Sequence, residues 1–572
     1  MKTFKKGSLT AAIILFACSF AQADDNNNDH KAPKLVLQIT VDQLRGDLPQ
    51  RYLKRMAEGG FRYLYDEGLV YSNAHHAHAN NETIVGHTTL ATGAHPSSHG
   101  MVGNLWFDQK LGRVVYNVED PKYPLLSKDA GVNKGAEIDH TQKAAKTSGR
   151  SPSNILVSTF GDELALASNG KAKIFGVSVK DRGAISMAGH AGKAFWFSKK
   201  SGEFVTSQFY YDEYPDWAAE WNDKRLADTY SGKAWELLKD QDSYLFINND
   251  DQEWETNFPG YGRVFPHQFG NTESKYFNTL LTLSPVGDVL TLDFAKALMV
   301  SESIGLDEIT DYLSVSFSST DYVGHLFGPS SLEMEDNLLR LDKTLANLFA
   351  FVDKKVGLKN TLIVLSADHG APEAPGLLRE FGIEANTIDP SSWEKEKGFA
   401  NLKAKLGVGE ELIESYSHPY VYLNHALIKK KKLGVKTVEN LVIAELLKLD
   451  GVAYAVSRSD LESGNLPDTE LYKKLVNNHN VTRSGDIMVA FAPHRFVNEF
   501  DGLTVASAHG SPWNYDTFVP VIFAGWSIDD GEVNHKINTV DIAPTLSNLL
   551  RIKPPSGADG QVLEAVINSS RD

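Results

Sequence analysis

The stretch Leu35-Val36-Leu37-Gln38-Ile39-Thr40-Val41-Asp42 indicates the fold class of this 572-residue chain. Its nearly continuous apolar and β-branched run is typical of a strand buried on both faces of a parallel sheet. Asp42 follows at the carboxyl end, which is where doubly wound α/β sheets bind ligands. A single Asp after a strand is more simply a helix cap. Asp42 therefore gains weight as a site candidate only if other strands end in a similar way.

Two later apolar runs do end on acidic and histidine side chains. One is followed by Asp321 and His325, whose i, i+4 spacing places both side chains on one side of a helical turn, where they can chelate one ion. The other ends in Asp368 and His369 before a glycine. Adjacent Asp and His at the end of a buried strand indicate a metal site more strongly than either residue does alone.

The segment 80–93 is predicted to be a loop that enters a short helix, with Thr83 at its start and Gly93 at its end. A hydroxyl there faces unpaired backbone N–H groups and the positive end of the helix dipole, which favour an alkoxide and attract anions. Thr is also an ordinary helix cap. With His509, the candidate ligands number seven, about what two tetrahedral zinc ions require with one open position. They are Asp42, Thr83, Asp321, His325, Asp368, His369 and His509.

Two cations follow the strand predicted at 173–179. Lys180 and Arg182, at i and i+2, could point into one cleft, and a surface Lys-Asp-Arg turn explains them equally well. The histidines of the 75–78 segment are set aside, because three in four residues cannot easily converge on one ion along an extended chain. We set aside His87, His95 and His99 in the same way.

The first residues resemble a secretory signal peptide. Residues 1–23 carry three lysines, an apolar run and a small-x-small cleavage site. Removing these lysines takes the formal charge from −16 to −19, which argues against nucleic acid or an anionic membrane surface as partner. We expect a periplasmic or secreted protein without a transmembrane segment. The alternative is a lipid anchor through Cys18, the one cysteine.

The remaining pattern predicts an α/β fold, a doubly wound and mostly parallel sheet flanked by helices, with inserted capping subdomains. We expect a flexible N-terminus at 24–33 and a catalytic domain at 34–572, with insertions at about 110–300 and 371–508. Helices are predicted at 154–168, 276–306 and 332–356. The run Lys429-Lys430-Lys431-Lys432 is most simply a solvated surface.

The ordered motifs resemble the alkaline phosphatase superfamily, and within it the PafA-type bacterial enzymes and the related type I phosphodiesterases/nucleotide pyrophosphatases. The motifs are Val41-Asp42-Gln43-Leu44-Arg45, Glu82-Thr83-Ile84-Val85-Gly86-His87, Gly103-Asn104, Asp321-x-x-x-His325, Ala367-Asp368-His369-Gly370, His509-Gly510 and Asp541-Ile542-Ala543-Pro544-Thr545. The resemblance spans nearly all of the chain after residue 23. It departs from the family at Ile84-Val85, where small Gly and Pro residues are expected.

This resemblance implies one zinc held by Asp321, His325 and His509. It implies a second held by Asp42, Asp368, His369 and the Thr83 oxygen. Asn104, Lys180 and Arg182 match residues that contact substrate oxygens. Two Zn²⁺ per chain are expected, and no obligatory Mg²⁺, because Lys180 could supply the charge that a third metal gives Mg-dependent relatives.

The implied activity is hydrolysis of small phosphate monoesters by a monomer, through a phospho-threonine intermediate. A phosphodiesterase or nucleotide pyrophosphatase with the same two-metal site is the main alternative. A sulfatase would need Cys or Ser in a Cys/Ser-x-Pro-x-Arg setting, which Thr83-Ile84-Val85-Gly86-His87 does not provide. A non-catalytic exported metal-binding protein remains a further alternative, although it would not need a nucleophile at a helix start.

Overall fold

Strand β1 (Leu35–Val41) lies in the middle of the central sheet. In this computed structural model it pairs in parallel with β10 (Asp311–Phe317) on one side and with β11 (Thr361–Ser366) on the other. All seven β1 residues are buried, as the apolar run predicts. The structure describes residue 1 and residues 31–497 and 503–570, so the predicted signal peptide, with Cys18, and most of the 24–33 segment lie outside the described residues.

The described part of the chain forms a central sheet of ten strands. Strands β5, β6, β10, β1 and β11 are parallel, whereas β18 runs antiparallel to its neighbours β11 and β2. The order is β19 (Gly531–Val533), β2 (Leu69–His75), β18 (Phe518–Gly525), β11, β1, β10, β5 (Ile174–Ser178), β6 (Lys193–Ser198) and β7 (Glu203–Val205), with β20 (Ile537–Asn538) paired to β2.

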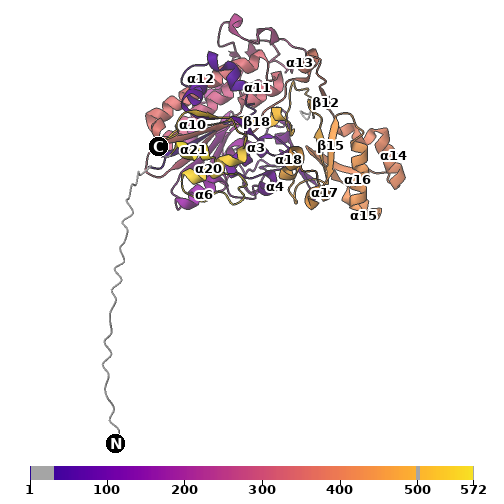
Figure 1. Cartoon of the computed structure of the whole chain (residues 1–572). Coiled ribbons are helices and arrows are strands. Elements are labelled where there is room, and N and C mark those ends of the chain that lie inside the picture. Colours follow the sequence, from indigo (N-terminus) through magenta and orange to yellow (C-terminus); the bar gives the residue numbers. More distant parts are fainter. Residues whose placement is uncertain (2–30, 498–502, 571–572) are drawn as a thin grey trace. The chain divides into compact units, whose positions relative to one another are not determined.

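Helices cover both faces of this sheet, because successive strand side chains point to opposite faces. Leu37 and Ile39 pack in one cluster with residues of α10 (Val286–Ser301) and α12 (Leu332–Lys355). Val36 packs in another, with residues of α3 (Thr83–Thr92), α6 (Phe160–Ala167) and α20 (Ile542–Leu549). Figure 1 shows α10 and α12 on one side of the sheet and α6 and α20 on the other. The predicted doubly wound, mostly parallel sheet flanked by helices is confirmed.

The strand register aligns the carboxyl ends of the central strands. Val41 of β1 lies opposite Phe317 of β10, and Thr40 lies opposite Ser366 of β11. On the next strand, Ser316 pairs with Ser178 of β5. Loops that leave these four strands therefore begin at the same edge of the sheet. The candidate site residues that follow these strands in the sequence therefore lie at this edge.

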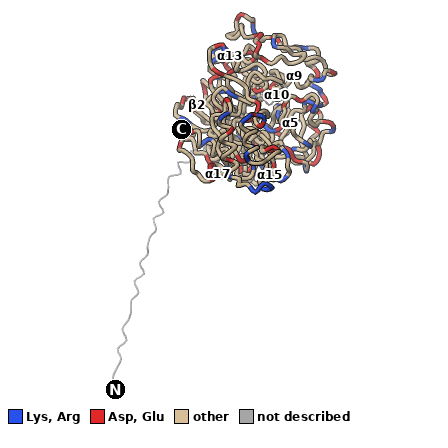
Figure 2. Tube along the Cα trace, turned by 90° about the vertical axis from the view of Figure 1, so that its right-hand side faces the viewer, with Lys and Arg blue, Asp and Glu red and all other residues tan. Residues whose placement is uncertain are grey.

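A second sheet lies within the range 371–508. It contains β13 (Ile413–Ser417), β14 (Tyr420–Leu423), β16 (Ile487–Phe491) and β15 (Val452–Ser457), paired antiparallel in that order. Its helices include α14 (Lys397–Leu406), α15 (His425–Lys430) and α16 (Val435–Leu446), drawn in orange in Figure 1. The lysine run begins in α15 and appears as a blue segment in Figure 2.

The range 110–300 also contains core elements. Strands β5, β6 and β7 belong to the central sheet, and α10 packs against its face. Helix α6 packs against the opposite face, and α8 (Asp216–Asp223) adds Ala218 and Trp221 to the cluster that contains α10. The range also contains the short helix α5 (His140–Ala144).

Two predicted helices differ from the observed ones. The helix predicted at 154–168 begins only at Phe160, because Thr159 and Asp162 form a capping box that fixes its start. The helix predicted at 276–306 is broken into α9 (Phe277–Thr282) and α10, with Pro285 at the break. The helix predicted at 332–356 matches α12 within one residue. Among the described residues, no helix is both long and apolar enough to cross a bilayer.

Helix α3 approaches the loop after β11 so closely that only glycine fits at position 86. A Cβ on Gly86 would lie 1.9 Å from the carbonyl oxygen of Asp368. We expect Gly86→Ala to separate α3 from this loop, lower the free energy of unfolding by about 1–3 kcal/mol, and lower the midpoint of thermal unfolding.

Gly409→Ala is the matched control, because a Cβ there would meet no atom within 4 Å. It should leave the midpoint unchanged. A Gly86→Ala protein that unfolds at the wild-type temperature would contradict this account of the packing.

Candidate metal centre

Six Asp and His side chains gather at the carboxyl edge of the central sheet in two groups. Within each group, one ligand atom from each residue lies within 4.8 Å of the others. Asp42 directly follows β1, the Asp321 and His325 pair lies on α11 (Ser319–Phe327), and the Asp368 and His369 pair follows β11. The first group is Asp321, His325 and His509, and the second is Asp42, Asp368 and His369. The resemblance implied the same division of these six residues, with the Thr83 oxygen added to the second group.

Backbone carbonyls orient all three histidines of these groups. The Nδ1 atom of His325 lies 2.8 Å from the oxygen of Ser507, and that of His509 lies 2.7 Å from the oxygen of Asn81. His369 Nδ1 lies 3.0 Å from the oxygen of Gly370. A carbonyl can only accept, so Nδ1 carries the proton in each ring and Nε2 is left as the basic nitrogen. Metal-ligating histidines are typically held in this way.

The second group contains buried polar atoms that lack hydrogen-bond partners. Asp42 Oδ1 and His369 Nε2 are buried, lie 3.5 Å apart and have no hydrogen-bond partner in the described part of the chain. Burial and the neighbouring charge of Asp368 raise the pKa of Asp42 well above its usual range. A divalent cation would satisfy both atoms and favour ionised Asp42. The His and Asp donor set fits zinc.

Lys180 connects the two groups. Its ammonium is fully buried and contacts one carboxylate of each group, with Nζ 2.8 Å from Asp42 Oδ2 and 2.5 Å from Asp321 Oδ2. Burial disfavours the charged form, but Asp321 and Asp42 outweigh burial and raise the pKa of Lys180. Lys180 is therefore a fixed positive charge between the groups.

Thr83 is the first helical residue of α3, and Glu82 occupies the cap position without a side-chain cap bond. The Thr83 hydroxyl is consequently free of the capping role that a Thr at a helix start often has. It accepts a hydrogen bond from Arg182 Nη2 at 3.4 Å. Arg182 belongs to α7 (Asp181–Ala188), which follows β5. Its guanidinium stays charged, because Asp139 and other neighbours outweigh burial and raise the pKa of Arg182.

Asn104 lies beside Thr83 with its amide orientation fixed. Its Oδ1 accepts from the backbone N–H of Ile84 at 3.2 Å, and its own backbone N–H donates to Glu82 Oε2 at 2.7 Å. The Nδ2 donors are therefore not turned toward Ile84. Together with Thr83 and Arg182, Asn104 lines a cavity that also touches the first group. The cavity residues are Glu82, Thr83, Asn104, Asp139, His140, Thr141, Arg182, Asp321, Tyr322, His325, Val497, Ala508 and His509.

The structure adds two residues that sequence reasoning missed as site residues. Gln43 follows Asp42 with a positive φ of 66°. It donates its backbone N–H to Asp368 Oδ1 at 3.1 Å and its amide Nε2 to Asp321 Oδ1 at 2.8 Å, so it holds one carboxylate of each group. His87, one helical turn after Thr83, lies with Nδ1 3.0 Å from Asp368 Oδ2. The i, i+4 spacing from Thr83 was the signal in the sequence.

Two of the other histidines that were set aside, His76 and His99, have hydrogen-bond partners within the fold. His76 is buried, with Nε2 3.0 Å from the oxygen of Ala367 and Nδ1 2.8 Å from Thr539 Oγ1. His99 Nε2 lies 3.2 Å from Thr89 Oγ1. Neither His75, His76 nor His78 belongs to a metal-compatible group of described residues.

Comparison with known proteins connects this site to one family. The model of the type I phosphodiesterase / nucleotide pyrophosphatase family matches residues 36–512. The chain is 36% identical to the alkaline phosphatase PafA of Elizabethkingia meningoseptica, over 94% of each chain. It is 35% identical to the alkaline phosphatase PhoV of Synechococcus elongatus, over 93% of this chain and 92% of that protein.

The fold agrees with these sequence matches. The crystal structure of wild-type PafA superposes with a TM-score of 0.85 and 35% identity, covering 94% of this chain and 99% of the other. Similarity at this level extends over almost the whole of both chains. The chain therefore belongs to the type I phosphodiesterase / nucleotide pyrophosphatase family, on the branch of the alkaline phosphatase superfamily that contains PafA.

Proposed function

We propose that this protein is an exported alkaline phosphatase that hydrolyses small phosphate monoesters through a phospho-threonine intermediate at a two-zinc site. The observation that supports this most directly is the position of Thr83. Thr83 begins a ten-residue helix. Its hydroxyl accepts a hydrogen bond from Arg182, in a cavity that His325 and His509 also line. The alkaline phosphatases PafA and PhoV are full-length relatives.

The two groups of Asp and His would each hold one zinc ion. Asp321, His325 and His509 would hold the first ion, and Asp42, Asp368 and His369 would hold the second together with the Thr83 oxygen. When bound, the ions supply Lewis acidity that lowers the pKa of a ligated hydroxyl and stabilises a leaving oxygen. Lys180 already places a positive charge between Asp42 and Asp321, which supports the expectation that no magnesium is obligatory.

The proposed reaction has two steps, in which residues of this chain have separate roles. Thr83 Oγ would attack phosphorus as its hydroxyl loses the proton, the bond from phosphorus to the ester oxygen would break, and that oxygen would take up a proton and leave as the alcohol. Water then attacks the phosphorus of phospho-Thr83, which restores the hydroxyl and releases inorganic phosphate. Arg182 and the Nδ2 donors of Asn104 would hold the non-bridging oxygens of the phosphoryl group while it is transferred, because both residues line the cavity beside Thr83.

A phosphodiesterase is the second candidate, since the matching family model carries that description. The charges at the site favour the monoesterase. A monoester dianion carries one more anionic oxygen than a diester. Arg182 is a buried cation beside Thr83, and Lys180 is a second buried cation, which contacts Asp42 and Asp321. A diester would gain more from an apolar pocket at that place.

The assignment of Thr83 as nucleophile predicts that its substitution lowers turnover but not the zinc content. Thr83→Ala should retain nearly all of the bound zinc, because the six Asp and His ligands remain, and should lose most turnover. Thr83→Ser should keep part of the activity, since it retains a hydroxyl. Mass spectrometry of an acid-quenched reaction with a monoester should find phosphate on the peptide that contains Thr83. Phosphate trapped on any other peptide would end this assignment.

The charge argument predicts that Lys180→Ala separates monoesters from diesters. Monoester kcat/KM should fall by about a hundred-fold or more, as for the loss of one electrostatic contact in a preorganised site. A diester should lose much less. Both rates are measured at saturating zinc with the metal content determined, because Lys180 contacts the carboxylates of two proposed ligands. Equal losses for both substrates, or a wild-type preference for diesters, would favour the phosphodiesterase.

A further inference from the structure

Arg182 is held by a carboxylate that no part of the proposed reaction uses. Its Nη1 donates to Asp139 Oδ2 at 2.8 Å, while Nη2 points to Thr83 Oγ1 at 3.4 Å. The third donor, Nε, has no hydrogen-bond partner among the described residues. One carboxylate oxygen therefore determines how the buried guanidinium is turned relative to the nucleophile. The rigid, planar fork of arginine recognises phosphate oxygens through its geometry, so the direction in which the fork is held matters.

Asp139 is itself fixed by its own helix. It is the N-cap of α5, and its Oδ1 accepts from the Thr141 N–H at 2.9 Å, from the Thr141 hydroxyl at 2.5 Å and from the Gln142 N–H at 3.4 Å. These bonds occupy Oδ1 and leave Oδ2 to face Arg182. Burial opposes ionisation, but the charges of Arg182 and Lys199 hold the pKa of Asp139 well below its usual range.

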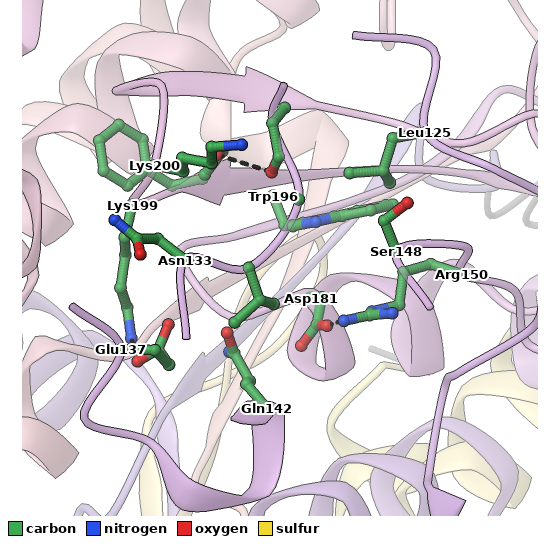
Figure 3. Close-up of a pocket in the computed structure, with 15 residues that line it drawn as sticks. Leu125, Asn133, Glu137, Gln142, Ser148, Arg150, Asp181, Trp196, Lys199 and Lys200 are labelled. Atoms are coloured by element: carbon green, nitrogen blue, oxygen red, sulfur yellow. Dashed lines mark hydrogen bonds and ion pairs between the residues drawn. The ribbon is translucent and has the colours of Figure 1, made fainter. Parts of the chain in front are cut away.

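A second ion pair fastens the segment that carries Asp139. Glu137 Oε1 accepts from the backbone N–H of both Ile138 and Asp139 at 3.0 Å and from Lys199 Nζ at 2.7 Å. Lys199 follows β6 of the central sheet. Figure 3 shows the Lys199 side chain reaching down to Glu137 at one wall of a pocket. The position of Asp139 is thus tied to the sheet through Lys199.

The acid next to Arg182 in the sequence is already engaged. Asp181 accepts from Arg150 Nε at 2.7 Å and from the Tyr116 hydroxyl at 2.5 Å. Figure 3 shows the Arg150 guanidinium directed at Asp181 on the opposite wall of that pocket. Asp181 also receives the backbone N–H of Arg182, but not its guanidinium. Asp139 is therefore the carboxylate that is paired with the Arg182 side chain in the described structure.

From this geometry we infer that Asp139 is a positioning residue for phosphoryl transfer, which aims the Arg182 guanidinium at the phosphoryl group on Thr83. The inference rests on the proposed function, because it needs Arg182 to contact substrate. Asp139 acts through Arg182: its Oδ1 caps α5, its Oδ2 accepts from Arg182, and it belongs to neither group of metal-compatible residues in the described part of the chain. Its removal should matter when Arg182 is present and should not matter when Arg182 is absent.

A double-mutant cycle tests this dependence. Asp139→Asn is the main variant, because the amide oxygen can still cap α5 while the charge facing Arg182 is lost. Monoester kcat/KM should fall by about ten-fold to a hundred-fold, less than the hundred-fold to thousand-fold typical for loss of a donor itself. In an Arg182→Ala background, Asp139→Asn should change the rate by less than about two-fold, since contacting residues are not additive.

Asp162→Asn is the matched control. Asp162 is another buried acid in a helix cap, and it pairs with His190 at 2.8 Å, away from the cavity. It should leave monoester kcat/KM unchanged at saturating zinc. Asp139→Asn could also lower thermal stability. A general loss of folded enzyme lowers monoester and diester rates equally, so a fall in the ratio of monoester to diester kcat/KM still identifies an effect on the site.

Three outcomes would overturn the inference: no effect of Asp139→Asn, the same factor in both backgrounds, or an unchanged ratio of monoester to diester rates. The proposed function fails separately, if the wild-type protein does not hydrolyse monoesters. If wild type is active and Arg182→Ala alone is silent, Arg182 does not contact the phosphoryl group and the role of Asp139 is excluded with it.

Discussion

Three carboxylates are buried at one edge of the central sheet, and the site depends on how their negative charge is balanced. Asp42, Asp321 and Asp368 each follow a strand, and the parallel register of β1, β10 and β11 brings the three strand ends level. Buried ionised carboxylates are costly unless they are paired or bind metal. Lys180 supplies one positive charge to Asp42 and Asp321. Two divalent ions would supply the rest.

This need for charge balance explains why hydrogen bonds fix the orientation of the histidines and carboxylates at the site. Backbone carbonyls hold the Nδ1 atoms of His325, His369 and His509, so that each Nε2 is basic. Gln43 adopts a left-handed backbone and links Asp321 and Asp368 through two hydrogen bonds. Strained backbone of this kind persists only where surrounding structure enforces it. Thr83 lies at the same edge, because Gly86 allows helix α3, which Thr83 begins, to approach Asp368 closely.

The sequence predicted those parts of the site that are attached to regular structure. An apolar run followed by Asp, as at Asp42, is visible without any fold knowledge, and the spacing of Asp321 and His325 follows from the helix period. His509 has no such signal, since it lies in a loop, and its partners came only from the resemblance. Asp139 could not be found, because it lies 43 residues before Arg182 in an irregular segment and meets it only in the folded chain. Gln43 was missed because nothing in its neighbours predicts a positive φ.

The most direct test of the bimetallic account is anomalous diffraction from crystals of the zinc-loaded protein, recorded above and below the zinc absorption edge. The account predicts two zinc peaks per chain, one among Asp321, His325 and His509 and the other among Asp42, Asp368, His369 and the Thr83 oxygen. Six Asp and His ligands with Thr83 suffice for two tetrahedral ions with one open position. A single peak, or zinc bound away from these residues in active crystals, would contradict it.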